Sequence, residues 1–328
     1  MIIGHTLALE YLKKAFMRNA VPHALFFWGP KEVGKRTIAE EFAKGFFCEK
    51  GSFLGCGECD GCSAENAIHK DHVINTREMH EAIEEETDSI GIETILAIQR
   101  KIQESSLVGK PRIVIIDGVE SVTPTAWNAL LKTLEEPPAD VYFILIGETK
   151  DSVLPTILSR SVPLRFSLVS LKDIEAYLAE NHGKLSENER ASFARFSGGR
   201  PGRLLKGLED PAVMKAAQQK LSVAFSILSN PLYASLQKID ELAKKEEPLD
   251  EYPDYLFLAL RSLFLMQYEA PNSYTLKIPE ALSKSLSTRY PGTLQAKAIN
   301  KLFTVNNLLK ETNVNRRMAL ESFVIELP

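Results

Sequence analysis

The pattern of apolar and polar positions divides the chain into one mixed region and two helical regions. Over residues 1–167, short apolar runs alternate with stretches of helical spacing. The runs are HALFFWG, HVIN, RIVIID, VYFILIG and VPLRF. Short apolar strands that alternate with helices are typical of a parallel sheet with crossover helices. The pattern therefore predicts an α/β domain over residues 1–167.

After residue 167 the apolar spacing is helical. Two short segments, LKDIEAYLAENHG and SENERASFARFSGG, each end in glycine and predict a small helical domain over residues 168–208. The apolar positions of residues 209–328 recur at helical intervals and predict an all-α bundle. Two stripes support this prediction: Val213, Ala217, Leu221, Ala224 and Leu228, and Leu294, Ala298, Leu302, Val305 and Leu309.

Composition and charge narrow the class of protein. The chain has 328 residues, of which 45% are hydrophobic and 25% are charged, as in globular proteins. No apolar run approaches the roughly 18 residues that cross a bilayer, and the N-terminus lacks the pattern of a signal peptide, so a cytoplasmic protein is expected. The net charge of −4 gives no reason to expect DNA binding by the chain alone.

The segment GPKEVGKRT resembles a phosphate-binding loop. Gly29 and Gly34 match the glycines of G-x-x-x-x-G-K-[ST], and Lys35 matches the lysine that binds the terminal phosphates. The loop lies between an apolar run and a helical stretch, which is the context that the motif requires. Arg36, however, occupies the position of the hydroxyl residue that binds magnesium, and Thr37 supplies a hydroxyl one residue later.

The second half of a phosphate-loop site is an acidic residue at the end of an apolar strand, usually with a neighbouring glutamate that activates water. RIVIIDGVE supplies Asp117, but Gly118 stands in the position of that glutamate, and Glu120 lies too far along the chain to be assumed a substitute. We therefore predict a degenerate ATP site, with slow hydrolysis through Thr37 as the alternative. Its expected residues are Gly29, Gly34, Lys35, Thr37 and Asp117.

All four cysteines lie in one window with the spacing C-x7-C-x2-C-x2-C. They are Cys48, Cys56, Cys59 and Cys62. Four converging thiolates suit a tetrahedral ion and leave no open position for water, so a structural Zn²⁺ site is predicted. Two alternatives remain open. Disulfides conflict with a reducing cytosol, and a ferredoxin-type iron–sulfur motif places its fourth cysteine downstream and before a proline. The nearby His69 and His72 are expected to be solvated or core residues rather than ligands.

Two further stretches carry a family resemblance. WNALLKTLEEPPADVYFILIG and LPTILSRS closely resemble the AAA+ subunits of the bacterial DNA polymerase III clamp loader. The resemblance extends over nearly the whole chain through IIGH, VPHALFFWGP, the four-cysteine segment, SGGRPGRLLKG and NVNRRMALESFVIEL. Within that family, the two altered catalytic positions and the SGGRPGR form are similar to delta-prime-type rather than gamma/tau-type subunits.

This resemblance implies an architecture and a set of partners. The architecture is an AAA+ core, a helical lid and a C-terminal collar that joins the subunits into a hetero-pentamer. In such a complex, gamma/tau-type subunits bind ATP, and together with a delta subunit the assembly places the sliding clamp on primed DNA as part of the DNA polymerase III holoenzyme. A delta-prime-type subunit is then expected to be a stator without ATPase activity of its own.

The resemblance also assigns a role to one arginine. In the family, the arginine that matches Arg160 points into the ATP site of the neighbouring subunit, so Arg160 is expected to be catalytic in trans. The motif keeps Ser159 but has Ser161 in place of its cysteine, and Gly202 stands about where an active subunit places its sensor arginine. An ATP-hydrolysing, gamma/tau-like motor subunit is the alternative function.

Overall fold

The computed structural model describes residues 2–62, 72–76, 79, 89–103, 111–268, 284, 286, 288–309 and 314–327. The chain divides into two compact units. The N-terminal unit comprises Met1–Asp173 and Arg200–Gly202, and the C-terminal unit comprises Ile174–Gly199 and Arg203–Pro328.

The N-terminal unit is built on a parallel sheet, as the apolar runs predict. Its described strands are β1 (Ala24–Trp28), β2 (Val73–Asn75), β3 (Arg112–Asp117), β4 (Val141–Gly147) and β5 (Val162–Arg165). Their order in the sheet is β2-β3-β4-β1-β5, and every neighbouring pair is parallel. Trp28 pairs with Gly147, and Asp117 pairs with Ile146. The carboxyl ends of β1, β3 and β4 therefore meet at one edge.

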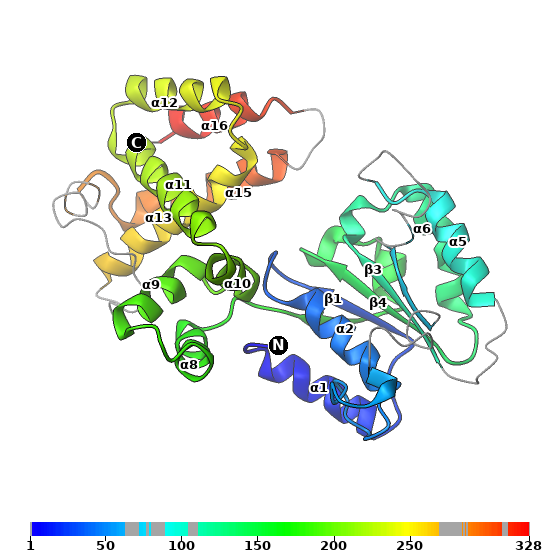
Figure 1. Ribbon diagram of the computed structural model, residues 1–328. Helices are drawn as coiled ribbons and strands as arrows, with labels where there is room; N and C mark the ends of the chain where they lie inside the picture. The colour runs from blue at the N-terminus through cyan, green and yellow to red at the C-terminus, as the bar shows by residue number, and fades with distance from the viewer. Residues whose placement is uncertain are drawn as a thin grey trace. The chain divides into compact units, whose positions relative to one another are not determined.

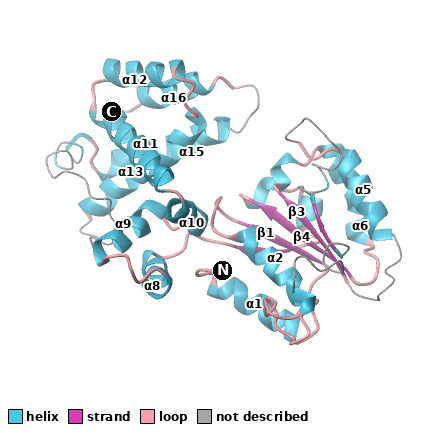
Figure 2. Cartoon of the chain, viewed as in Figure 1, coloured by secondary structure: helices cyan, strands magenta, loops and turns pink. Residues whose placement is uncertain are grey.

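Helices cover both faces of this sheet (Figures 1 and 2). Helices α1 (Thr6–Met17) and α2 (Lys35–Gly45) pack on the face that carries Leu25 and Phe27. Helices α5 (Ile92–Gln103) and α6 (Pro124–Glu135) pack on the opposite face, which carries Phe26. Successive strand residues thus fill two different apolar cores, which explains why the strands read as continuous apolar runs.

Short elements join the strands to the helices. They are η1 (Asp60–Cys62), η2 (Val119–Ser121), η3 (Lys150–Ser152) and α7 (Pro155–Leu158). The start of α6 follows from its sequence, because the Thr123 side chain accepts a hydrogen bond from the backbone N–H of Ala126 and Pro124 occupies the first turn.

The described elements of the C-terminal unit are helical. They are α8 (Leu171–Asn181), α9 (Glu187–Ser197), α10 (Pro201–Glu209), α11 (Pro211–Ser229), α12 (Leu232–Lys244), η4 (Leu249–Glu251), α13 (Tyr252–Gln267), α15 (Gly292–Leu309) and α16 (Arg316–Ile325). The first residues of α8 and of α10 belong to the N-terminal unit. Helix α9 packs on α11, and the partly buried Phe196 contacts the bundle core. A separate lid over residues 168–208 stays a prediction.

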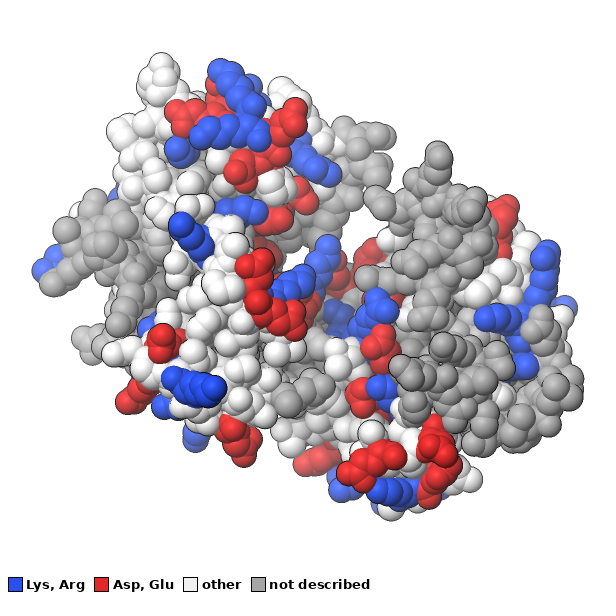
Figure 3. Space-filling model, viewed as in Figure 1, with Lys and Arg blue, Asp and Glu red and all other residues white. Residues whose placement is uncertain are grey.

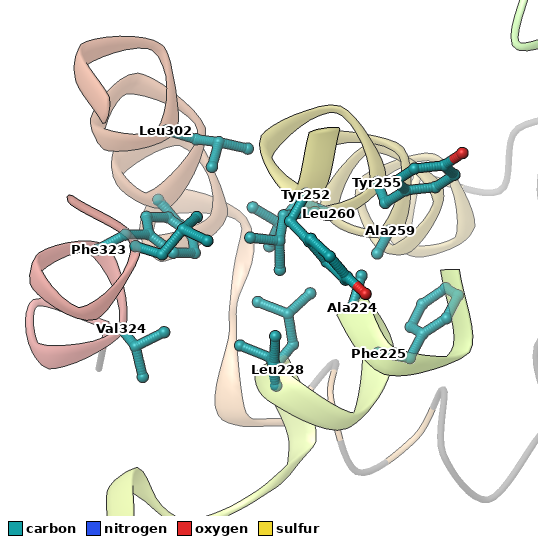
Figure 4. Close-up of a cluster of buried hydrophobic side chains, with 14 of the residues drawn as sticks. Ala224, Phe225, Leu228, Tyr252, Tyr255, Ala259, Leu260, Leu302, Phe323 and Val324 are labelled. Atoms are coloured by element: carbon teal, nitrogen blue, oxygen red, sulfur yellow. The ribbon is translucent and has the colours of Figure 1, made fainter. Parts of the chain in front are cut away.

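Side chains from α11, α13, α15 and α16 converge in the core of this unit (Figure 4). The two predicted stripes supply much of it, since Ala224, Leu228, Leu302 and Val305 are all buried. Val213 is the exception, because 38% of it is exposed near the start of α11.

We expect Phe323→Ala in α16 to destabilise the C-terminal unit by about 3–5 kcal/mol, because its fully buried ring leaves a cavity that the neighbouring helices only partly fill. Ile325→Ala on the same helix is the matched control. Ile325 is 57% exposed, so its loss should change the free energy of unfolding by no more than about 0.5 kcal/mol. Chemical denaturation of both variants measures the difference, and equal effects would contradict this packing.

Candidate functional site

The phosphate loop begins where β1 ends, and its first glycine is required by close packing. A Cβ on Gly29 would lie 1.9 Å from the carbonyl oxygen of Phe166. The Gly29 N–H donates to the carbonyl of Gly147 at 3.2 Å. Gly34 has a φ of 101°, which also favours glycine, and it ends the loop at the first turn of α2. Both predicted glycines therefore shape the loop.

Lys35 is folded into the loop. Its Nζ donates to the carbonyl oxygens of Gly29 at 2.5 Å and Pro30 at 2.6 Å. Burial lowers the pKa of Lys35 to about 8, although nearby carboxylates, with Glu148 the strongest, oppose that change. The lysine is thus placed among the loop's backbone groups, where a phosphate would bind.

Arg36 lies on the side of the loop where magnesium would bind. Its Nε donates to Oε1 of Glu40 at 2.6 Å, and its NH1 lies 3.7 Å from Oδ2 of Asp117. A guanidinium has no lone pair to offer a cation and carries a permanent positive charge. Thr37 follows on α2 and is half-buried. These residues do not fit the usual magnesium site of a phosphate-loop enzyme.

The position of the water-activating base is occupied by a turn. Gly118 has a φ of 84°, and its N–H donates to the carbonyl of Ile146 at 3.0 Å. The turn η2 then brings Glu120 back to the end of β4, where its carboxylate accepts a hydrogen bond from the N–H of Glu148. Glu148 in turn pairs with Lys31 at 3.2 Å. Sequence spacing did not indicate this return of Glu120, because a 3-10 turn has no signature in VES.

Gly202 lies against the same loop within the N-terminal unit. Its N–H donates to the carbonyl of Glu32 at 2.8 Å, and a Cβ at this position would lie only 3.1 Å from that carbonyl oxygen. A residue with a side chain here would crowd the loop. The glycine at the expected sensor-arginine position therefore permits close contact between backbones.

The four cysteine sulfurs converge, as predicted. All four Sγ atoms lie within 4.8 Å of one another, with Cys59 and Cys62 at 3.4 Å and Cys56 and Cys62 at 3.9 Å. Zn–S bonds of about 2.3 Å in a tetrahedron hold sulfurs about 3.8 Å apart, so the cluster fits such an ion. Among the described residues, this is the group of side chains that could hold a metal.

Glycines make the convergence possible. A Cβ on Gly61 would lie 1.9 Å from the Phe47 carbonyl oxygen, and one on Gly55 would lie 3.3 Å from Sγ of Cys62. His72 is buried with its ring centroid 5.8 Å from that of Phe47, as expected of a core residue. His69 lies outside the described residues.

Arg160 lies apart from the phosphate loop. Arg160 comes just before β5, whereas the loop comes just after β1. Because β1 and β5 are parallel, Arg160 lies at the edge of the sheet where the strands begin and the loop lies at the edge where they end. Its NH2 lies 2.7 Å from Oε1 of Glu135, and its NH1 donates to the Thr156 carbonyl at 2.9 Å and to Oγ of Ser159 at 3.2 Å. The sequence did not predict Glu135 as its partner.

The surface of the C-terminal unit combines ion pairs with exposed apolar side chains. Figure 3 shows basic and acidic side chains side by side over α12 and α16, where Arg317 pairs with Asp240 at 2.6 Å. Several large apolar residues of this unit are exposed: Leu232, Tyr233, Tyr268, Phe303, Leu308, Met318 and Ile325.

Comparisons with known proteins identify a family and several relatives of this chain. The family model described as DNA polymerase III, delta subunit, matches residues 4–170. The delta' subunit of Pseudomonas aeruginosa is 31% identical over 55% of this chain and 53% of its own length. The delta' subunit of Escherichia coli is 21% identical over 97% of this chain and 92% of its own. The tau/gamma subunit of Haemophilus influenzae is 31% identical over 66% of this chain.

The chain spans between 28% and 53% of the length of the first curated relatives that it matches. Among solved structures, a gamma subunit-related protein of Thermotoga maritima matches 96% of this chain and 97% of its own with 18% identity and a TM-score of 0.40.

The parallel sheet, the glycine loop after β1 and the acidic residue that ends β3 define an α/β protein of the phosphate-loop type. The chain belongs to the family described as DNA polymerase III, delta subunit, and both delta' and tau/gamma subunits are among its curated relatives. None of its described helices combines the length and the apolar character needed to cross a bilayer.

The lowered pKa of Lys35 predicts a dependence of stability on pH. Between about pH 8 and 10.5 the folded protein binds fewer protons at Lys35 than the unfolded chain. The free energy of unfolding of the unmodified protein, relative to Lys35→Met, should therefore increase as the pH rises through this window. Chemical denaturation at several pH values measures the difference, with Lys31→Met as the control for loss of a loop lysine. If the difference in the free energy of unfolding between the unmodified protein and Lys35→Met stays constant or falls as the pH rises, the pKa of Lys35 is not lowered by burial.

Proposed function

We propose that this chain is a non-catalytic stator subunit of a DNA polymerase III clamp loader. In this proposal it assembles in the cytoplasm with gamma/tau-type and delta-type subunits as a hetero-pentamer that loads the sliding clamp onto primed DNA. The observation that carries the proposal is the replacement of two catalytic groups, because Arg36 faces Asp117 where magnesium would bind and Gly118 replaces the base.

Each replacement affects a different requirement of phosphoryl transfer. Magnesium bridges the β- and γ-phosphates and neutralises developing charge, and the base orients the attacking water. A glycine cannot take a proton, and a guanidinium cannot ligate a cation. Gamma/tau-type relatives also match the chain, so ATP turnover by the isolated protein separates the stator from an ATP-hydrolysing motor subunit.

Arg160 is proposed to complete the ATP site of a neighbouring subunit. The Arg160 side chain is 35% exposed, and the side chain of its counter-ion Glu135 is 47% exposed. Exposed pairs of this kind contribute about 0–1 kcal/mol, so Arg160 can exchange Glu135 for a phosphate at small cost. An arginine supplied in trans stabilises the charge of the transition state and accelerates hydrolysis by about 10³–10⁵.

The C-terminal unit is proposed to be the collar through which the subunits assemble. Its exposed apolar side chains, among them Tyr233, Phe303 and Met318, are of the aromatic and methionine types that are enriched in interfaces. Obligate interfaces commonly bury more than about 2,000 Å², an area that a helical unit of this size can supply.

The cysteine cluster is proposed to bind structural Zn²⁺. Its four thiolates would complete the tetrahedral coordination, so the ion would stabilise the segment after α2 without taking part in turnover.

Arg160→Ala should leave folding, zinc content and assembly unchanged but silence the one neighbouring site that it serves. Total ATPase activity of the complex should fall in part and clamp loading should fall further, because the lost rate factor of about 10³–10⁵ applies to one site. ATPase and clamp-loading assays of the reconstituted complex measure both.

Two matched variants accompany Arg160→Ala. Arg165→Ala removes an exposed arginine on β5, whose guanidinium lies over the Trp28 ring at 5.4 Å, and should preserve activity. Glu135→Gln removes the resident counter-ion and should preserve activity as well. A complex that carries Arg160→Ala and works at the unmodified rate would exclude the trans role.

Cys59→Ala should abolish zinc binding and lower the thermal midpoint of the N-terminal unit, by about 2–4 °C for each kcal/mol lost in a domain of this size. Metal analysis and thermal unfolding measure the two effects. Ser52→Ala is the control, since it removes only a hydrogen bond at 2.7 Å to the Gly55 carbonyl in the same segment. Loss of clamp loading with intact zinc and stability would argue against a purely structural role.

A further inference from the structure

We propose that Arg36 is the residue that excludes magnesium from this site, because its guanidinium serves as the built-in counter-ion of Asp117. The inference rests on the proposed non-catalytic function and deepens it. It attributes the inability of the site to bind a magnesium–nucleotide complex to one side chain, Arg36, while the phosphate loop itself keeps its shape.

The carboxylate of Asp117 needs a cationic partner. Its side chain is only 12% exposed, so solvent compensates its charge poorly. Its backbone N–H donates to Oγ1 of Thr76 at 3.1 Å, which fixes the end of β3. NH1 of Arg36 lies 3.7 Å from Oδ2 of this carboxylate. The guanidinium therefore occupies the position in which a cation bound to Asp117 would compensate its charge.

Glu40 holds Arg36 in this orientation. The two residues are four apart on α2, so their side chains lie on one face of the helix. Nε of Arg36 donates to Oε1 of Glu40 at 2.6 Å, which leaves the other end of the planar guanidinium directed at Asp117. A magnesium ion ligated by Asp117 would lie within a few ångströms of this permanent positive charge and be repelled by it.

The rest of the loop is preserved. Gly29 and Gly34 form the turn, and Lys35 is placed among the loop carbonyls. The altered element is therefore the cation side of the site. A single substitution that removes the guanidinium and supplies the missing hydroxyl should then restore a magnesium-dependent contribution to nucleotide binding.

The test compares ATP binding to the isolated full-length chain in excess Mg²⁺ and in EDTA, for the unmodified protein and for Arg36→Thr. Magnesium should leave the unmodified protein's affinity unchanged, or binding should be immeasurable in both buffers. Arg36→Thr should bind ATP about tenfold more tightly with Mg²⁺ than with EDTA. If circular dichroism shows that Arg36→Thr does not fold, the same measurements are made on Arg36→Ser.

Two further variants identify the cause. Lys31→Thr removes a positive charge from the same loop, but Lys31 pairs with Glu148 rather than with Asp117, so this variant should stay insensitive to magnesium. Adding Asp117→Asn to Arg36→Thr should abolish the gained dependence, because the carboxylate that ligates magnesium is lost.

Three results would overturn the inference: an unmodified protein whose ATP affinity rises about tenfold with magnesium, a folded Arg36→Thr protein without magnesium dependence, or the same gain in Lys31→Thr. These measurements use the isolated chain. The proposed stator function is tested separately, by ATP turnover of the isolated protein and by the activity of the assembled complex, so either proposal can fail without the other.

Discussion

The structure depends on the position of β1 between β4 and β5. Backbone hydrogen bonds on both sides fix this strand. The residue that follows it, Gly29, lies so close to the Phe166 carbonyl that there is no room for a side chain. Gly29 is therefore a steric requirement of the sheet as well as a feature of the loop. Because β3 and β4 end at the same edge, the same pairing brings Asp117 and Glu148 to the loop. The altered residues thus stand on an intact framework.

Much of the fold was predictable because it follows from local patterns. Apolar runs indicated the five strands, and helical stripes indicated the bundle core. The convergence of the cysteines was also predictable from their spacing. The contacts of Glu135 with Arg160 and of Glu120 with Glu148 were not, because they join residues that only the tertiary fold brings together. Val213 fits the helical stripe but lies in the first turn of α11, where part of the helix face is exposed.

Charge compensation within the chain is the common feature of both candidate sites for nucleotide chemistry. Arg36 is paired with Glu40 and Asp117, whereas Arg160 is paired with Glu135. The first pairing involves a carboxylate that is largely shielded from water, and the second involves two partly exposed groups. Solvent screens the second pair far more, so it separates more easily. The shielded pair of Arg36 and Asp117 is therefore suited to keeping a cation out of the phosphate-loop site. The exposed pair of Arg160 and Glu135 is suited to leaving Arg160 available to a partner.

Helix α2 joins two regions that differ in chemistry. Its first turn carries Lys35 and Arg36, and its last residue, Gly45, has so little space that a Cβ would lie 2.3 Å from the Phe53 carbonyl oxygen in the cysteine segment. The helix has 11 residues, which corresponds to a length of about 16 Å. The cysteine segment thus packs closely against the C-terminal end of α2. Loss of the cysteine cluster should therefore increase the rate of amide hydrogen exchange in α2, from its C-terminal end towards its first turn at the phosphate loop.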